Sequence, residues 1–142
     1  MTEYPRGATL RRVIETFISP DDDAIEKLGE LFTDDVTVWT PNMLAVGVVD
    51  LAENLIYRES AFSDVDIHFD TLDIFGSRGL AEFRVTGTFS GPFVIEEAAV
   101  IEPNGKRLLL GAAAVADFKG DKIRAVRAYF DDASLLEQML DA

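Results

Sequence analysis

The chain has 142 residues, 48% of them apolar, which is enough for one hydrophobic core and too few for two ordinary domains. Its 26 acidic and 13 basic residues give a formal net charge of -13, so a nucleic acid backbone or an anionic membrane surface would repel it. The absence of cysteine excludes disulfides and thiolate metal sites. We therefore expect a single domain over residues 1–142 that binds neither nucleic acid nor a membrane.

The first 62 residues have mostly helical spacing. Apolar residues repeat at steps of three and four over residues 9–19, at Leu10, Val13, Ile14, Phe17 and Ile18. A second helix is predicted to start with a capping box at Ser19, the cap, followed by Pro20 at the first helical position and Asp22 as the acidic partner. The β-prone residues 36–39 predict a short strand, and the Asp50 and Glu53 pair predicts a third helix over about residues 50–62.

From Val65 the apolar pattern changes to a period of two. The alternation over residues 65–69 shifts phase at Leu72, which predicts a bulge near Asp70 that bends the strand. Turn residues separate further predicted strands at Leu80–Phe89, Phe93–Glu102, Arg107–Phe118 and Ile123–Phe130. Helical spacing returns after Asp131. Helices followed by a strand meander predict an α+β fold, with the helices on one face of a curved antiparallel sheet.

Three segments carry motifs of one protein family. They are Leu-Phe-Thr-Asp-Asp-Val at 31–36, Thr-Gly-Thr-Phe-Ser-Gly-Pro-Phe at 86–93, and the stretch 104–139 with Tyr-Phe-Asp followed by a Leu-Leu-Glu-Gln helix. In this order they resemble the SnoaL-like polyketide cyclases, within the nuclear transport factor 2-like and ketosteroid isomerase superfamily. The resemblance implies a cone-shaped fold, an apolar pocket, ring closure without a metal or any other cofactor, and homodimers packed through the outer sheet face.

The resemblance also implies that a carboxylate at the end of the last strand handles a substrate proton. Asp131 is the matching residue. Desolvation in a closed apolar pocket raises the pKa of a carboxyl group, which suits proton exchange near neutral pH. Strand alternation puts Arg127 and Tyr129 on the same face as Asp131, as supporting polar groups. The plain alternative is that Asp131 or Asp132 only caps the helix that follows.

Large side chains are expected to shape the pocket. The predicted substrate-binding set adds Trp39, Met43, Tyr57, Phe89 and Phe93 to Arg127 and Tyr129. Small residues at 111–116 of a central strand, opposite large aromatics, predict either a cavity or a close contact between sheets. In the preceding strand, alternation puts Phe83 and Val85 on the inner face and Glu82 and Arg84 on the outer face.

Two departures from the family pattern affect the chemistry. Phe89 and Trp39 stand at or near positions where the family often has histidine, so a second proton carrier is missing. The Arg-x-Asp pair of the related limonene epoxide hydrolases would fall near residues 96–99, where there is no arginine. His68, the single histidine, lies on the polar side of its strand and is interpreted as solvated, and no metal site is predicted.

These observations predict a cyclase or isomerase-type enzyme for an apolar, polyketide- or steroid-like substrate. A non-catalytic binder of a hydrophobic small molecule and a protein-interaction module on the same fold are the alternatives. The N-terminal residues 1–10 have no apolar signal-peptide core, which indicates a cytoplasmic protein. No apolar run approaches the roughly 18 to 20 residues of a membrane span.

Overall fold

A strongly curved sheet of six strands dominates the structure, in the order β2-β1-β8-β7-β4-β3. It is a computed structural model that describes residues 5–57, 61–96 and 99–141. The strands are β1 Phe32–Thr40, β2 Met43–Val46, β3 Phe62–Phe75, β4 Arg78–Phe89, β7 Arg107–Lys119 and β8 Lys122–Phe130. Neighbours pair antiparallel except β1 and β8, which are parallel. The predicted α+β class with a curved antiparallel sheet is confirmed, and the parallel β1–β8 pair is the one exception among the described strands of this sheet.

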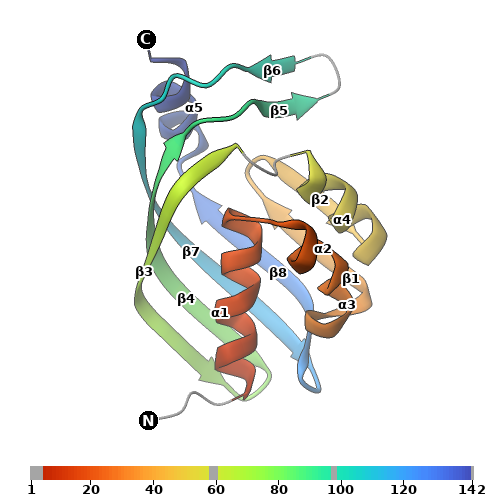
Figure 1. Cartoon of the computed structure of the whole chain (residues 1–142). Helices are drawn as coiled ribbons and strands as arrows, with labels where there is room; N and C mark the ends of the chain where they lie inside the picture. Colours follow the sequence, from red (N-terminus) through yellow and green to blue (C-terminus); the bar gives the residue numbers. More distant parts are fainter. Residues whose placement is uncertain (1–4, 58–60, 97–98, 142) are drawn as a thin grey trace.

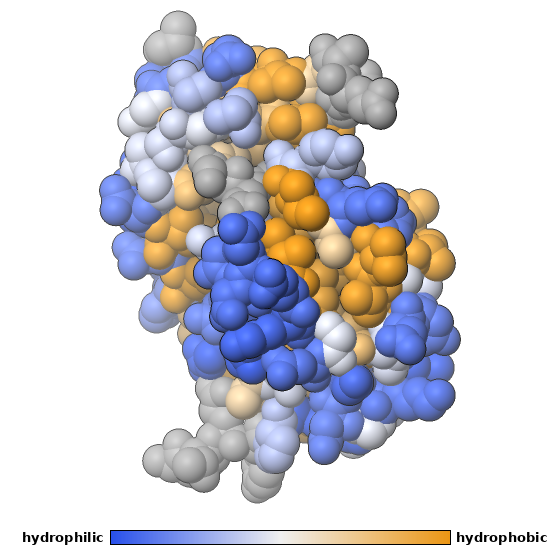
Figure 2. Space-filling view, turned by 45° about the vertical axis from the view of Figure 1, so that its right-hand side comes forward, coloured by the Kyte–Doolittle hydropathy of each residue, from blue (hydrophilic) through white to orange (hydrophobic). Residues whose placement is uncertain are grey.

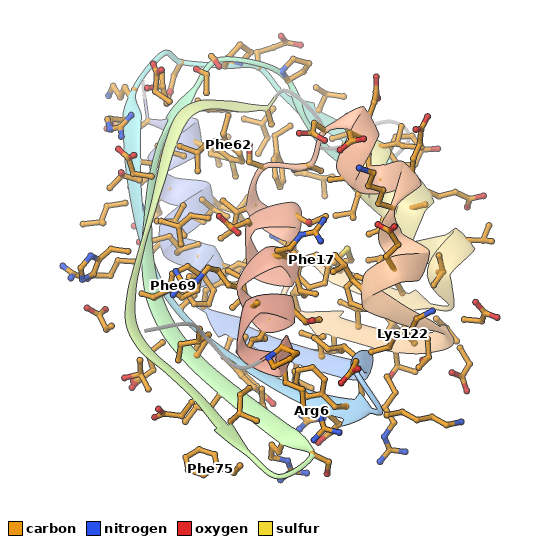
Figure 3. All side chains as sticks on the ribbon, turned by 60° about the horizontal axis from the view of Figure 1, so that its bottom comes forward. Arg6, Phe17, Phe62, Phe69, Phe75 and Lys122 are labelled. Atoms are coloured by element: carbon orange, nitrogen blue, oxygen red, sulfur yellow. The ribbon has the colours of Figure 1, made fainter. Side chains whose placement is uncertain are left out.

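Five helices accompany the sheet in the described part of the chain. They are α1 Pro5–Ile18, α2 Asp22–Glu26, α3 Leu28–Leu31, α4 Val48–Ile56 and α5 Asp132–Leu140. Helix α1 crosses the concave face of the sheet, and α5 lies at the opposite end of the molecule from the start of α1 (Figure 1). Arg6 anchors the start of α1, because its guanidinium donates to the backbone oxygens of Gly76 and Gly120 in two strand turns (Figure 3).

The buried side chains form two separate clusters. The main cluster joins α1, α3 and α4 to the sheet and includes the fully buried Leu10, Phe32 and Val38. The second cluster lies around α5 and consists of Ala61, Phe89, Phe93, Leu108, Leu135 and Met139. Apolar residues that repeat at helical steps in the helices and at every second position in the strands provide both clusters.

The bend of the sheet has a local cause in β3. The pairing of β3 with β4 shifts register between Phe69 and Thr71, which confirms the bulge predicted near Asp70. A second shift lies between Ser63 and Asp66, where Asp64 has a φ of 51°. Bulges bend a strand and increase its twist, so these two irregularities curl β3 around the concave face.

A short hairpin stands apart from the main sheet. Strands β5 Phe93–Glu96 and β6 Ala99–Ile101 pair with each other as a two-stranded sheet. Ile95 and Val100 on this hairpin are about half exposed. Figure 2 shows hydrophobic side chains at the top of the molecule, where the hairpin lies, above a hydrophilic surface over the N-terminal helices.

Several predicted elements have other bounds in the structure, and one strand was missed. The predicted strand Phe93–Glu102 is divided into β5 and β6, and its residues 97 and 98 lie outside the described residues. The predicted helix over 50–62 is α4, while Phe62 begins β3 and residues 58–60 lie outside the described part. The second predicted helix is divided into α2 and α3, and Asp21 rather than Ser19 caps it, because the Asp21 carboxylate accepts from the Ala24 amide at 2.7 Å. Strand β2 was not predicted.

The capping pattern at Asp50 and Glu53 was misleading for a physical reason. Helix α4 follows Gly47, whose φ of 89° suits glycine, and Asp50 already lies in the first helical turn. The Asp50 carboxylate accepts a hydrogen bond from the Val46 amide at 2.9 Å, so it joins β2 to the helix. Among the described residues, no helix combines the length and the apolar character needed to cross a membrane.

Candidate functional site

A cavity of about 150 Å³ lies between α1, the concave face of the sheet and α5. Figure 3 labels two aromatic residues of its wall, Phe17 on α1 and Phe62 at the start of β3. Further carbon-rich side chains complete most of the wall: Ile14 and Ile18 of α1, Met43 of β2, Phe83 and Val85 of β4, Phe93 of β5, Leu108, Leu110, Ala112 and Ala114 of β7, Val126, Ala128 and Phe130 of β8, and Leu135 of α5. Members of both core clusters therefore contribute to the wall, and the cavity lies between them.

Small residues of β7 make room for this cavity. Ala112 and Ala114 face it, in the middle of a strand that is paired with β4 on one side and β8 on the other. The larger Phe17 and Phe62 belong to the same wall. Of the two outcomes that the sequence left open for residues 111–116, the structure has the cavity. The inward positions predicted for Phe83 and Val85 are also confirmed, since both line it.

One end of the cavity is polar. Thr40 and Asn42 are the lining residues with hydrogen-bonding side chains in the described part of the chain. The Thr40 hydroxyl donates to Asn42 Oδ1 at 3.2 Å, and Asn42 Nδ2 donates to Asp132 Oδ1 at 3.1 Å. Asn42 thus connects the turn between β1 and β2 to the start of α5, 90 positions later in the sequence. Sequence reasoning missed this group, because only the fold brings its parts together.

Asp131 lies at the surface as the N-cap of α5. Its Oδ1 accepts a hydrogen bond from the Ser134 amide at 3.0 Å, and its side chain is exposed. Asp131 is not among the residues that line the cavity. The plain alternative considered for this residue, helix capping, is therefore what the structure displays. The catalytic role of Asp131 stays a prediction.

Arg127 and Tyr129 share one face of β8, as alternation predicts, and that face is the outer one. Arg127 donates to Asp117 Oδ2 at 3.2 Å. Tyr129 is 49% exposed, and its ring lies 5.4 Å from that of Trp39. The cavity side of β8 belongs to the intervening residues, which include Val126 and Ala128. Alternation relates residues within a strand, but it does not say which set faces inward.

The other predicted pocket residues are divided between wall, core and surface. Met43 and Phe93 lie on the cavity wall. Phe89 is fully buried in the second cluster, with its ring 5.8 Å from that of Phe62. Trp39 and Tyr57 are 42% and 57% exposed and do not line the cavity. A contact of Trp39 and Tyr57 with a substrate stays a prediction.

Charged groups are concentrated on the outer face of the sheet. Partial burial raises the pKa of Asp117, but hydrogen bonds from Arg78 and Arg127 outweigh it and hold that pKa below its usual value. Hydrogen bonds from Arg84 lower the pKa of Asp70 in the same way. Neither carboxylate lines the cavity. Within the described ranges, no cluster of three or more acidic or histidine side chains has a geometry that could hold a metal.

Comparison with known sequences identifies the family. Residues 8–139 match the family described as SnoaL-like polyketide cyclase. The chain belongs to this family. None of the curated proteins searched matches the chain.

Solved structures share the fold at low sequence identity. A proposed SnoaL-like polyketide cyclase from Jannaschia sp. CCS1 has a TM-score of 0.79 and 14% identity, over 100% of this chain and 99% of that one. A proposed polyketide cyclase from Acidithiobacillus ferrooxidans has a TM-score of 0.76 and 16% identity, over 98% and 96%. An LEH-like epoxide hydrolase from M. tuberculosis has a TM-score of 0.63 and 14% identity, over 93% and 89%. These likenesses establish the fold.

Proposed function

We propose that the chain is a cyclase or isomerase-type enzyme that takes an apolar small molecule into the cavity between α1 and the sheet. The observation that carries the proposal is a cavity of about 150 Å³ with a wall made almost wholly of carbon. Protein interiors are normally packed as densely as organic crystals, and an empty space of this size lowers stability. A chain that keeps such a space in its core has a reason to do so, and ligand binding is the simplest one. Family membership supports the same proposal.

Filling the cavity tests the proposal. Ala112→Leu adds three carbon atoms to the wall, and Ala113→Leu makes the same change at the next residue, which faces the other side of β7. Neutral ketones of one to four rings serve as probes, with thermal shift to measure binding and liquid chromatography to separate products, because an isomer has the same mass as its substrate. We expect Ala112→Leu to lower affinity and turnover at least tenfold and Ala113→Leu to keep both. Full binding by a folded Ala112→Leu protein would show that the cavity is not the site.

Acid/base chemistry needs a group that carries a proton, and Asp131 is the residue proposed from the family pattern. Its carboxylate would have to leave the Ser134 amide to meet a substrate, since in the structure it caps α5. Asp131→Asn separates the two roles, because asparagine caps a helix as well as aspartate but does not take up a proton. We expect turnover to be abolished while Tm changes by only a few degrees. Unchanged turnover would remove Asp131 from the mechanism.

Binding without catalysis is a second candidate, and one observation favours it. Among the described residues, none that lines the cavity has an ionisable side chain. A protein of this kind would be stabilised by its ligand and would release that ligand unchanged. If the unaltered chain forms a product and Ala112→Leu abolishes its formation, the protein is an enzyme and not only a binder.

We also propose a homodimer that forms through the outer sheet face. Support comes from exposed apolar side chains on the neighbouring strands β2, β1, β8 and β7, namely Leu44 and Val46, Trp39, Tyr129, and Leu109. Exposed apolar side chains on neighbouring strands suit an interface between identical chains. Leu44→Glu should convert the dimer to a monomer in light scattering, and a monomeric unaltered chain would contradict the proposal. The cytoplasmic location stays a prediction, which fractionation of producing cells would test.

A further inference from the structure

We infer that Arg107, on the outer face of the sheet, positions one side of the cavity wall on the inner face. It acts through a bulge at the start of β3, which brings both Phe62 and Val65 onto the wall. Arg107 does not line the cavity itself, so it is a positioning residue. The inference rests on the proposed function for its effect on ligand affinity, whereas its effect on the wall can be measured without a ligand.

The bulge decides which side chains of β3 face the cavity. Phe62 and Val65 are three positions apart, so plain alternation would put them on opposite faces of the sheet. Both nevertheless line the cavity, and Figure 3 shows Phe62 inside the curve of β3. The reason is the register shift between Ser63 and Asp66, where one extra residue in β3 reverses the phase of the alternation. A regular strand would turn Phe62 to the outer face.

The residues of the bulge are held in a conformation that needs support. Asp64 and Val65 together stand opposite Gly87, since the residues on both sides of them are paired one to one. Asp64 has a φ of 51°, the left-handed conformation that glycine usually supplies at the first position of such a bulge. Gly87 provides space, because a Cβ atom there would lie 3.3 Å from Val65 Cγ2 and 3.7 Å from Phe62 Cβ. A left-handed aspartate costs free energy, so other contacts have to stabilise the bulge.

Arg107 supplies these contacts from β7, with β4 between it and β3. Its Nη1 donates to the backbone oxygen of Asp64 at 2.8 Å, and its Nη2 donates to Asp66 Oδ2 at 3.2 Å. The same two nitrogens donate to the hydroxyl oxygens of Thr88 at 3.4 Å and Thr86 at 3.0 Å on β4. One planar guanidinium thus ties the bulge to the strand opposite it, which a single ammonium group could not do as well.

The second bulge of β3 provides a matched control. Arg84 donates to both carboxylate oxygens of Asp70, at 3.1 and 2.9 Å, beside the register shift between Phe69 and Thr71. None of the residues 69–71 lines the cavity. Arg84→Met therefore removes an arginine–aspartate pair at a bulge of the same strand, on the same face, without a wall residue.

Nuclear Overhauser contacts between aromatic rings measure the wall in the absence of a ligand. In the structure the Phe62 ring lies 5.8 Å from that of Phe89 and 6.1 Å from that of Phe93. We expect Arg107→Met to weaken both contacts at least twofold, because Phe62 turns away when the bulge is lost, and Arg84→Met to keep both. Unchanged contacts in Arg107→Met would overturn the inference.

Calorimetric titration of the full chain with acetophenone, a one-ring ketone, measures the consequence for binding. Arg107→Met should lower the affinity about three- to tenfold, the effect of losing part of an aromatic contact with the ligand. Arg84→Met should keep the affinity within about twofold. Equal losses in the two variants would show a general effect of removing a surface arginine and would overturn the inference.

Two substitutions of Asp64 separate positioning from general stability. Arg107→Met combined with Asp64→Gly should regain the ring contacts and an affinity within about twofold of the unaltered chain, because glycine adopts a positive φ without the arginine. Asp64→Val leaves Arg107 in place, but a β-branched residue disfavours a positive φ. It should therefore weaken the ring contacts and the affinity as Arg107→Met does.

The contrary results have distinct meanings. If Asp64→Gly does not restore the ring contacts to Arg107→Met, the bulge is not the link, and the inference is overturned. If the ring contacts change while the acetophenone affinity does not, the effect of Arg107 on the ligand is overturned. If the unaltered chain binds no ketone but the ring contacts change as expected, the proposed function fails, and the positioning of the wall by Arg107 is supported.

Discussion

Small residues have opposite consequences at the two ends of the concave face. Near the start of β4, a Cβ atom on Gly79 would lie only 2.9 Å from Leu10 Cδ2, so glycine lets α1 lie directly on the sheet. Its partner on β7, Ala116, is fully buried in the main cluster. Four residues earlier on the same face of β7, Ala112 faces the cavity. A small side chain thus permits close packing where α1 lies directly against it and leaves a hollow where the opposite wall does not reach it.

The largest expected effect comes from truncating one aromatic residue at each end. Phe32 is fully buried and stacks on Phe17 with ring centroids 5.9 Å apart. Phe32→Ala should lower the free energy of unfolding by about 3–5 kcal/mol. Phe93→Ala, at the cavity wall, should lower the free energy of unfolding by about 2 kcal/mol less than Phe32→Ala does, because part of the Phe93 side chain already faces empty space. Urea denaturation measures both, and equal losses would mean that the two ends are packed alike.

Enlarging one alanine at each end sharpens the same comparison. Ala116→Leu forces three carbon atoms into a packed region and should lower the free energy of unfolding by about 1–3 kcal/mol or more. Ala112→Leu has the cavity to occupy and should cost less than about 1 kcal/mol. The two variants share strand, face and change of volume. A larger loss for Ala112→Leu than for Ala116→Leu would contradict the account of the cavity.

Helix α5 lies at one end of the cavity. The side chain of Gln138 joins it to β7 through the pair of hydrogen bonds that a neighbouring strand would form. Gln138 Nε2 donates to the Leu109 carbonyl at 3.0 Å, and the Leu109 amide donates to Gln138 Oε1 at 2.9 Å. Gln138→Ala should lower the free energy of unfolding by about 1–2 kcal/mol and speed hydrogen exchange of the Leu109 amide. Glu137→Ala, at an exposed neighbouring position, is the control. Unchanged exchange in Gln138→Ala would show that α5 is held by other contacts.

The smallest expected effect concerns pH and the outer face. The pKa of Asp117 is held below its usual value in the folded chain, so its stabilising effect is complete above pH 4 and is lost as pH falls through the lowered pKa. Asp117→Asn should therefore reduce the difference in unfolding free energy between pH 7 and pH 3 by about 1 kcal/mol or less, since the ion pairs lie near the surface. A variant with the same pH profile as the unaltered chain would show that the pairs contribute nothing.

Most of the fold follows from periodicity in the sequence. The change from helical steps to alternation at Val65 and the shift of phase near Asp70 predicted both the order of elements and the bulge. Strand β2 was missed because its four residues are too few to show alternation. The start of α4 was missed because Asp50 has the side chain of a cap, whereas Gly47 occupies that position.

The site was harder to predict because it depends on facts that no local pattern contains. Alternation grouped Arg127 with Tyr129 correctly, but the face they occupy depends on what packs against β8. A charged residue at 127 among apolar neighbours was the available signal for the outer face. The polar end joins Asn42 to Asp132 across 90 positions, and only the folded chain brings them together.

The most direct test of the central claim is a methyl NMR titration of the full chain with acetophenone. The account predicts shifts for methyl groups on the cavity wall, such as those of Ala112, Val126 and Leu135, and none for the exposed Leu44 or the fully buried Val38. Ala112→Leu should abolish these shifts. Shifts confined to Leu44 and other outer-face residues, with an unchanged wall, would contradict the claim that the cavity is the binding site.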